Sequence, residues 1–406
     1  MKKIILFLAT IGLLSQVVIA RDSDTGDDDT CQLIPGTYSS WSSTRTVYEI
    51  NQAGTYYFSG TISGDGSAFK INADNVTIYL ENFYMDTVLT GTYPGFQVYG
   101  SSTEIILVGE NTIVGMFSSP IEVKNTGSLT ISSENDGSLT LGANYSYPHY
   151  ALQSDGTTTI DGGTVIANAN GSTVSIGGTG DLVVNDGVVI ANEGMQQGNV
   201  TVNGGSVTSQ GNGSNAGINA DSVTVNGGTL VTTGGTSGGA GISADNVTIN
   251  NGTVTANGKG SAAGINSSSI AINGGLVSAN SEGGSAYSTS PSNASNETLY
   301  CVTLPDATAA VSSLFSISSV SDEIYTYTVT EPSNYSYSYS GTGLENTDDL
   351  YFYLPNGAYI ITGSDAAQGR QYGGVVNGGP TTFGVVPEPI YGCALLVVLL
   401  ALRMRK

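Results

Sequence analysis

The sequence is poor in basic residues. Its 406 residues include 11 Lys and Arg against 33 Asp and Glu, and six of the basic residues lie within the first 21 or the last four positions. Residues 22–402 therefore carry five basic side chains against all 33 acidic ones. Binding of nucleic acid through its phosphates needs stripes of Lys and Arg, and phosphate chemistry needs the same side chains at a site. The composition excludes the first class of function and argues against the second.

Histidine and cysteine are also scarce. His149 is the one His, which excludes a His-rich zinc site, and the three cysteines form no Cys-x-x-Cys pair. Cys393 lies in an apolar stretch near the C-terminus, which leaves Cys31 and Cys301 in the body of the chain. In an oxidising compartment these two can form a disulfide, and the sequence alone leaves open whether they lie within reach of each other.

The N-terminal residues have the features of an export signal. Lys2 and Lys3 precede the apolar run 4–14, and Ala20 offers a small residue at the expected cleavage point. The run is too short to span a membrane, so we predict that residues 1–20 are a secretory signal peptide. Residues 21–45, which include a dense run of Asp, then form an acidic linker.

The C-terminal residues combine three elements in order. Pro387, Glu388 and Pro389 precede the apolar run 390–402, and a basic tail ends the chain. As a helix this run reaches about 20 Å, short of the ~30 Å hydrocarbon core, although a marginal membrane helix with basic flanking charge is an alternative. Residues 386–406 resemble the PEP-CTERM sorting signal of Gram-negative bacteria. The resemblance implies handling by an exosortase-type membrane protease and delivery to the cell surface, the outer membrane or an exopolysaccharide matrix.

Between these ends the sequence repeats. The octapeptide Ile71–Ile78 returns as Ile218–Val225, Ile242–Ile249 and Ile265–Ile272. The late copies alternate with Gly-rich corners, which begin at Asp161, Asn185, Asn203, Asn226, Asn250 and Asn273. These starting positions are 24, 18, 23, 24 and 23 residues apart. A period in the twenties with short β segments is typical of a solenoid.

The residue types indicate which solenoid. β-branched residues alternate with Thr in the repeats, as in half-buried strands, and the Asn-Gly and Gly-Gly corners tolerate the positive φ of a sharp turn. We therefore predict an all-β fold, a right-handed parallel β-helix of roughly ten coils over residues 46–280, about 50 Å long.

Three early segments also carry a resemblance to a known family. Val47–Ile62, Asn75–Asn82 and Ile105–Thr112 resemble the entry coils of a bacterial carbohydrate-binding β-helix family. The later Gly-rich copies are similar to repeats of bacterial surface proteins, and the two resemblances together cover about residues 46–280. They imply a surface-displayed β-helix that binds polysaccharide.

After the repeats the composition changes twice. Residues 281–297 are rich in Ser, Gly and Asn and are predicted to be a linker. Short Tyr-rich strands separated by turn residues over 298–366 predict a small all-β, sandwich-like module. Residues 367–385 form a second, Gly-rich linker to the sorting signal.

Aromatic side chains are the first candidates for a site, because pyranose rings stack on aromatic faces. The alternative is that these rings cap the open end of the hydrophobic column. The candidate carbohydrate-binding residues are Tyr79, Tyr84, Tyr93, Phe96, Tyr99, Tyr145, Tyr147 and Tyr150.

Calcium is the candidate cofactor, since carboxylates are hard oxygen ligands. Asp74, Asp221 and Asp245 recur at one position of the repeat and can form an acidic stripe along the rod. The alternative is that each bonds the backbone of its own turn. Asp161 and Asp186, about one repeat apart, are the pair that a glycosidase would need, but the Asn residues that follow at the same corner favour a structural role.

These observations favour a non-catalytic, exported protein that binds polysaccharide, with calcium bridging to acidic sugars as an option. A structural or adhesive surface rod without a specific glycan is the alternative. A polysaccharide lyase or glycosidase is the second alternative, which the few widely spaced basic residues make less favourable.

Overall fold

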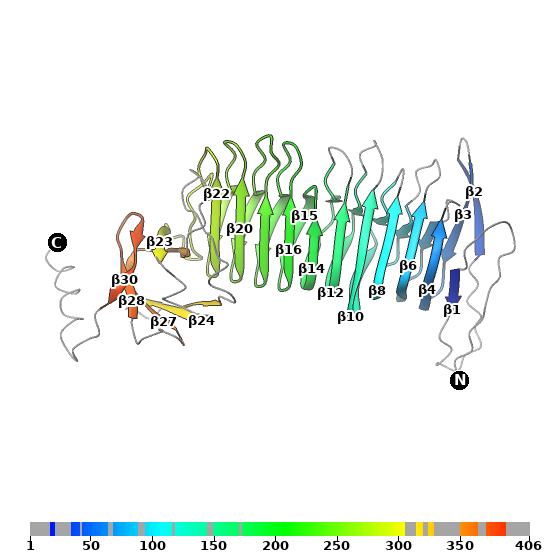
Figure 1. The fold of residues 1–406 in the computed structure, drawn as a ribbon, viewed down its shortest axis with the longest axis horizontal. Coiled ribbons are helices and arrows are strands. Elements are labelled where there is room, and N and C mark those ends of the chain that lie inside the picture. The colour runs from blue at the N-terminus through cyan, green and yellow to red at the C-terminus, as the bar shows by residue number, and fades with distance from the viewer. Residues whose placement is uncertain are drawn as a thin grey trace.

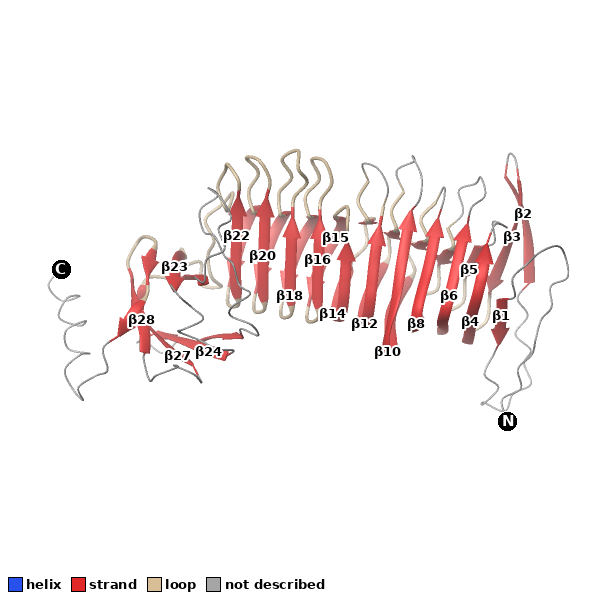
Figure 2. Ribbon diagram, viewed as in Figure 1, coloured by secondary structure: helices blue, strands red, loops and turns tan. Residues whose placement is uncertain are grey.

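The computed structural model describes the chain as strands and loops (Figure 2). The described residues are 17–20, 34–40, 43–63, 68–87, 94–115, 118–143, 149–169, 173–304, 314–319, 324–328, 350–363 and 371–386. In this part of the chain no helix is long and apolar enough to cross a membrane. Most of it winds into one elongated rod (Figure 1).

Each coil of the rod contributes one rung to each of three parallel ladders, which we call the first, second and third face. In the first six coils the first face consists of β3 (Ser43–Ile50), β5 (Ala68–Ile71), β7 (Phe96–Val98), β9 (Ile121–Val123), β11 (Leu152–Ser154) and β13 (Ile176–Gly177). The second and third faces of these coils share longer strands that bend at a corner, namely β4 (Gly54–Ser63), β6 (Val76–Thr87), β8 (Thr103–Gly115), β10 (Ser128–Ala143), β12 (Thr157–Asn168) and β14 (Leu182–Ala191).

From the seventh coil on, the strands break at a different corner. The first and second faces now share β15 (Met195–Val202), β17 (Ile218–Val225), β19 (Ile242–Ile249) and β21 (Ile265–Ile272). The third face consists of β16 (Ser206–Gln210), β18 (Thr229–Thr233), β20 (Thr253–Gly258) and β22 (Leu276–Ser281).

The register is that of a parallel solenoid. Ile218, Ile242 and Ile265, the first residues of three octapeptide copies, are direct partners on successive rungs. Ten rungs stack on each face, which makes about nine turns, and at ~4.8 Å per step the stack is about 43 Å long. The predicted parallel β-helix of roughly ten coils is confirmed.

The hydrophobic core is a set of columns along the axis. In β17, for example, Ile218, Val223 and Val225 are fully buried, while the Thr between the last two points outward. At the N-terminal end of the core the columns are aromatic. Phe96 stacks on Phe69 with ring centroids 5.0 Å apart, and Phe58 meets both rings edge to face.

Glycine at the corners lets neighbouring coils approach closely. Gly228 and Gly252 follow one another at the corner before the third face, with φ of +70° and +92°. A Cβ on Gly228 would lie 2.5 Å from the carbonyl oxygen of Gly205 in the preceding coil. This explains the repeated Gly of the corner, since both the φ and the spacing exclude a side chain.

At the N-terminal end two strands cover the first coil. β2 (Ile34–Ser40) forms an antiparallel hairpin with β3, so part of the predicted acidic linker 21–45 is a strand, whereas residues 21–33 lie outside the described residues. β1 (Val17–Ala20) pairs antiparallel with Tyr57–Gly60 of β4 in the full-length chain. The last four residues of the predicted signal peptide thus occupy the free edge of the first coil.

Residues 281–297 are not the linker that we predicted from their composition. Tyr287 pairs in parallel with Ile265, and Ser292 pairs in parallel with Ala271. The backbone N–H groups of Ile265 and Ile272 donate to carbonyl oxygens of this segment at 3.0 and 2.7 Å. Its backbone therefore continues the winding as an incomplete eleventh coil.

Two small sheets follow the solenoid. One contains β23 (Tyr300–Leu304), β26 (Leu350–Leu354) and β29 (Thr381–Thr382), and the other contains β24 (Leu314–Ser319), β25 (Ile324–Thr328), β27 (Gly357–Gly363), β28 (Gln371–Val376) and β30 (Gly384–Val386). The prediction that residues 367–385 form a second linker was wrong, because this segment contains β28 and β29. β28 pairs with β27, and β29 pairs with β23. The sandwich-like arrangement stays a prediction.

The first of these sheets closes the C-terminal end of the core. Leu299, Cys301 and Tyr353 belong to the same buried cluster as the last coils, and the Tyr353 ring meets that of Tyr287 edge to face at 5.1 Å. We call β23, β26 and β29 the C-terminal cap. Such a cap keeps the last apolar rung from water and from pairing with another chain.

The predicted bridge between Cys31 and Cys301 is not supported. Cys301 is a free, buried thiol in the C-terminal cap. Cys31 lies outside the described residues, three positions before Ile34, which pairs with Glu49 at the opposite end of the rod. Three residues span at most about 11 Å, far less than the ~43 Å of the stack.

Cys301 offers a probe of the C-terminal cap. Burial raises the pKa of its thiol to about 12, outweighing the lowering effect of a hydrogen bond with Tyr353. In a variant carrying Cys31→Ser and Cys393→Ser, we expect a thiol reagent at neutral pH to label Cys301 only as fast as the cap opens, because the reactive thiolate is absent from the closed state. Mass spectrometry over time measures this, and rapid labelling under native conditions would contradict the packing described.

Candidate functional site

The predicted aromatic surface does not form as one surface. Phe96 is fully buried in the core, so its assignment to a binding surface was wrong. Tyr79 lies on the second face, where its ring stacks on that of Tyr57 with centroids 4.8 Å apart. Tyr84 lies on the third face and is 39% exposed. Partial burial, and to a smaller extent the charge of Asp86, raises the pKa of Tyr84. Tyr93, Tyr145 and Tyr147 lie outside the described residues.

Two of the predicted aromatic residues lie at the first face. Tyr99 follows β7, and the Lys70 ammonium lies 5.1 Å from the centre of its ring. The Tyr150 ring covers Gly177 on β13, where a Cβ would come within 2.2 Å of ring carbon Cε1. Tyr150 therefore takes the outward place that a side chain at position 177 would otherwise fill. Of the predicted aromatic residues, these two therefore lie on one face of the rod.

One outward-pointing column runs along the whole first face, and we call it the first-face column. Each member is the direct partner of the next on successive rungs. In order, the column is Glu49, Lys70, Gln97, Glu122, Gln153, Gly177, Gln196, Asn219, Ser243 and Asn266.

The N-terminal half of this column is charged and internally paired. Lys70 lies 3.8 Å from Glu49. Glu122 forms an ion pair with Lys124 and accepts a hydrogen bond of 2.7 Å from Gln97. These side chains satisfy one another, which leaves little free capacity for a ligand.

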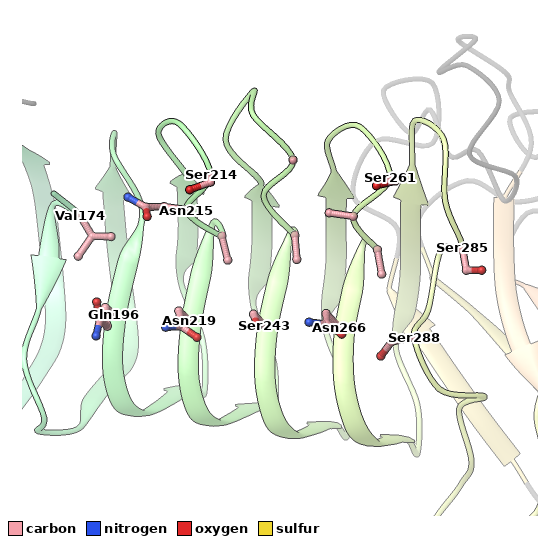
Figure 3. A pocket seen from close by; sticks show the side chains of 15 residues that line it. Val174, Gln196, Ser214, Asn215, Asn219, Ser243, Ser261, Asn266, Ser285 and Ser288 are labelled. Carbon is pink, nitrogen blue, oxygen red and sulfur yellow. The ribbon is translucent and has the colours of Figure 1, made fainter. Parts of the chain in front are cut away.

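The C-terminal half of the column forms the floor of a groove of about 620 Å³ along the axis (Figure 3). Gln196, Asn219, Ser243 and Asn266 lie in a row across four neighbouring strands, and Ser288 of the incomplete coil extends the row. The loops between the third and first faces form one wall, which includes Ser214, Asn215, Gly238, Ser261, Ala262 and Ser285. None of the residues that line this groove is charged.

The floor side chains are free to bind. Within the described part of the chain, the side chains of Gln196, Asn219, Ser243 and Asn266 make no hydrogen bond, in contrast to Ser288, whose hydroxyl donates to Ser267. An amide offers two donors and one acceptor, and a hydroxyl offers one donor and two lone pairs. The floor thus presents an uncharged array of donors and acceptors with a period of one rung.

The three candidate calcium ligands do not meet. Asp221 and Asp245 are neighbours on the eighth and ninth rungs, and Asp245 lines a smaller hollow of about 230 Å³ beside the groove. Asp74 lies six rungs away from Asp221. Its carboxylate accepts hydrogen bonds from the backbone N–H and the hydroxyl of Ser101. Both bonds lower the pKa of Asp74, the backbone bond more than the hydroxyl. Among the described residues, no group of three or more His, Cys, Asp and Glu gathers as metal ligands would.

The corner at Asp161 forms a ladder of side chains. Asp161 pairs with Asp186 in register, but each carboxylate is engaged, Asp161 with the Asn185 amide at 2.7 Å and Asp186 with the N–H of Gly187 at 2.7 Å. Each later Asn donates its amide to the one before at 2.7–2.8 Å, and we call this row the Asn ladder: Asn185, Asn203, Asn226, Asn250 and Asn273. This corner is built as a structural seam along the rod.

Comparison with known proteins gives no match, because no family model fits the chain and no curated protein or solved structure is detectably similar to it. The class of the protein therefore follows from its own geometry. It is a capped parallel β-solenoid with an uncharged axial groove on its first face.

Proposed function

We propose that this chain is a non-catalytic, exported β-solenoid that binds polysaccharide in the groove of its first face. The observation that carries this proposal is the row of four floor side chains that have no hydrogen-bond partner among the described residues. Sugar hydroxyls donate and accept, as amides and hydroxyls do, and an elongated groove suits a polymer better than a compact metabolite.

The sequence adds support of a different kind. The entry-coil segments resemble a carbohydrate-binding β-helix family, and the ends of the chain resemble export and PEP-CTERM sorting signals. On this proposal the partners are a polysaccharide of the cell surface or extracellular matrix and, during export, an exosortase-type protease. The sorting residues Pro387, Glu388 and Pro389 lie outside the described residues, as does the predicted apolar helix that follows them.

The test is retention of the purified full-length protein on immobilised polysaccharides, neutral and acidic, with and without EDTA. We expect retention on at least one of them, and no effect of EDTA, because the floor supplies uncharged ligands. Loss of retention in EDTA would instead support calcium-assisted binding near Asp221 and Asp245. Failure to bind any polysaccharide would overturn the proposal and favour the structural rod, to which the Asn ladder is well suited. Release of reducing or unsaturated ends would indicate an enzyme.

A further inference from the structure

We infer that the groove holds a neutral, linear and extended glycan parallel to the rod axis, with one sugar residue per rung. This inference rests on the proposed function and specifies the ligand of the same groove. Three properties of the groove lead to it: the spacing of its floor, its charge and the aromatic ring at one end.

The spacing follows from the register. Asn219, Ser243 and Asn266 are direct partners on rungs eight to ten, so equivalent atoms recur every ~4.8 Å along the axis. One residue of an extended, β-1,4-linked glycan advances its chain by nearly the same length. Each sugar can therefore lie over one rung. Successive sugars are turned over relative to one another and present their two edges to the floor in turn, and the floor side chains can bond either edge because amides and hydroxyls both donate and accept. A coiled α-1,4-linked chain does not keep this spacing.

The charge of the groove selects a neutral polymer. The lining carries no charged side chain, and Asp245 lies in the adjoining hollow. The nearest basic residue on the loop wall, Lys259, is already paired with Glu282 at 2.7 Å. A uronic acid polymer would meet no free cation here, and a chain with a formal net charge of −22 would repel it.

The ends of the groove set its length. The floor runs over five rungs, from Gln196 to Ser288. Beyond Gln196 the next outward place is covered by the Tyr150 ring, which offers a face for one pyranose to stack on. Further along, the column becomes charged and internally paired. The groove therefore accommodates about five or six sugars.

The first experiment measures affinity against ligand length. Linear β-1,4-linked glucose oligosaccharides, from the disaccharide to the decasaccharide, are titrated into the full-length protein by calorimetry. We expect affinity to rise about threefold to tenfold with each added sugar and to level off at five or six, since each rung adds about one net hydrogen bond. An α-1,4-linked glucose series is the control for the linkage and a β-1,4-linked glucuronic acid series is the control for the charge, and we expect both to bind at least tenfold more weakly.

The second experiment removes one coil. Deleting residues 242–264 joins Gly241 to Ile265, whose register partner is Ile242, and so removes one floor residue. We expect the plateau to move down by one sugar. The control variant lacks residues 96–120, a coil outside the groove. In it Ile121 takes the place of its register partner Phe96. We expect this variant to keep the plateau at five or six sugars. Circular dichroism and a thermal melt confirm that each variant is folded.

The outcomes separate this inference from the proposed function. Binding of neutral polysaccharide without a plateau at five or six sugars would overturn the rung-by-rung fit while leaving the proposed function intact. Preference for the glucuronic acid series over the glucose series would overturn the inference that the ligand is neutral. Failure to bind every oligosaccharide and polysaccharide tested would overturn both. Because the length series uses the unaltered protein, it decides the question even if a deletion variant does not fold.

Discussion

Replacing Phe96 by Ala is expected to lower the free energy of unfolding by about 3–5 kcal/mol, the usual cost of emptying a buried Phe site. Phe96 is fully buried, stacks on Phe69 at 5.0 Å and contacts Phe58 and Phe83 edge to face at 5.8 and 6.4 Å. These four rings come from three successive coils, so the cavity left by the Ala cannot close by a local shift. Urea unfolding followed by circular dichroism measures the change.

Tyr84→Ala is the matched control for this substitution. Tyr84 is 39% exposed and was predicted to belong to the same aromatic surface as Phe96. We expect its replacement to change stability by less than about 0.5 kcal/mol, as is usual for exposed positions. If Phe96→Ala left stability unchanged and reduced polysaccharide retention, Phe96 would be a surface residue and the core described above would be incorrect.

Replacing Asn219, Ser243 and Asn266 together by Ala is expected to weaken polysaccharide binding about a hundredfold without changing stability. Each substitution removes the side-chain groups that can bond a sugar, and three net hydrogen bonds of about 1 kcal/mol each amount to about two orders of magnitude in affinity. Stability should hold because these side chains have no hydrogen-bond partner in the described part of the chain. Calorimetry with the best-retained oligosaccharide and a thermal melt measure the two quantities.

Thr224→Ala with Thr248→Ala provides the control for the groove. These two residues are also outward-pointing register partners on the eighth and ninth rungs, but on the second face. We expect binding to stay within twofold of the unaltered protein, because neither residue lines the groove or the smaller hollow beside it. Equal losses from both sets of substitutions would show that binding is not confined to the first face.

The fold could be predicted because the same physical requirement recurs in every coil. Ile218, Ile242 and Ile265 occupy equivalent buried places, so a pattern that is weak in one coil becomes clear when it repeats. Composition was a poor guide at the ends of the rod. The Ser-, Gly- and Asn-rich segment 281–297 resembles a linker in sequence, yet its backbone pairs with the last complete coil because a parallel edge offers free N–H and C=O groups.

The groove was harder to predict from the sequence. Asn219, Ser243 and Asn266 are the second residues of their octapeptide copies, so their alignment on one face was visible. What the sequence did not reveal is the loop wall: its residues lie only three to five positions before a floor residue, but no pattern of the sequence shows that these loops rise beside the floor and enclose a groove. Phe96 was misassigned because the prediction rested on the density of aromatic residues and did not consider which of them point inward along the strand. In Phe96-Gln97-Val98 the alternation already places Gln97 outward and its two neighbours inward.

The Asn ladder and the backbone ladders run in the same direction, along the rod. A pull on the two ends of the chain therefore loads the bonds between the outermost coil and the rest first, so coils peel away singly. Each coil of about 23 residues stretches to about 80 Å when extended, against the ~4.8 Å that it occupies in the stack. If one end were anchored to a cell and the other held a matrix, the rod would lengthen in steps and absorb mechanical work while the remaining coils stayed folded.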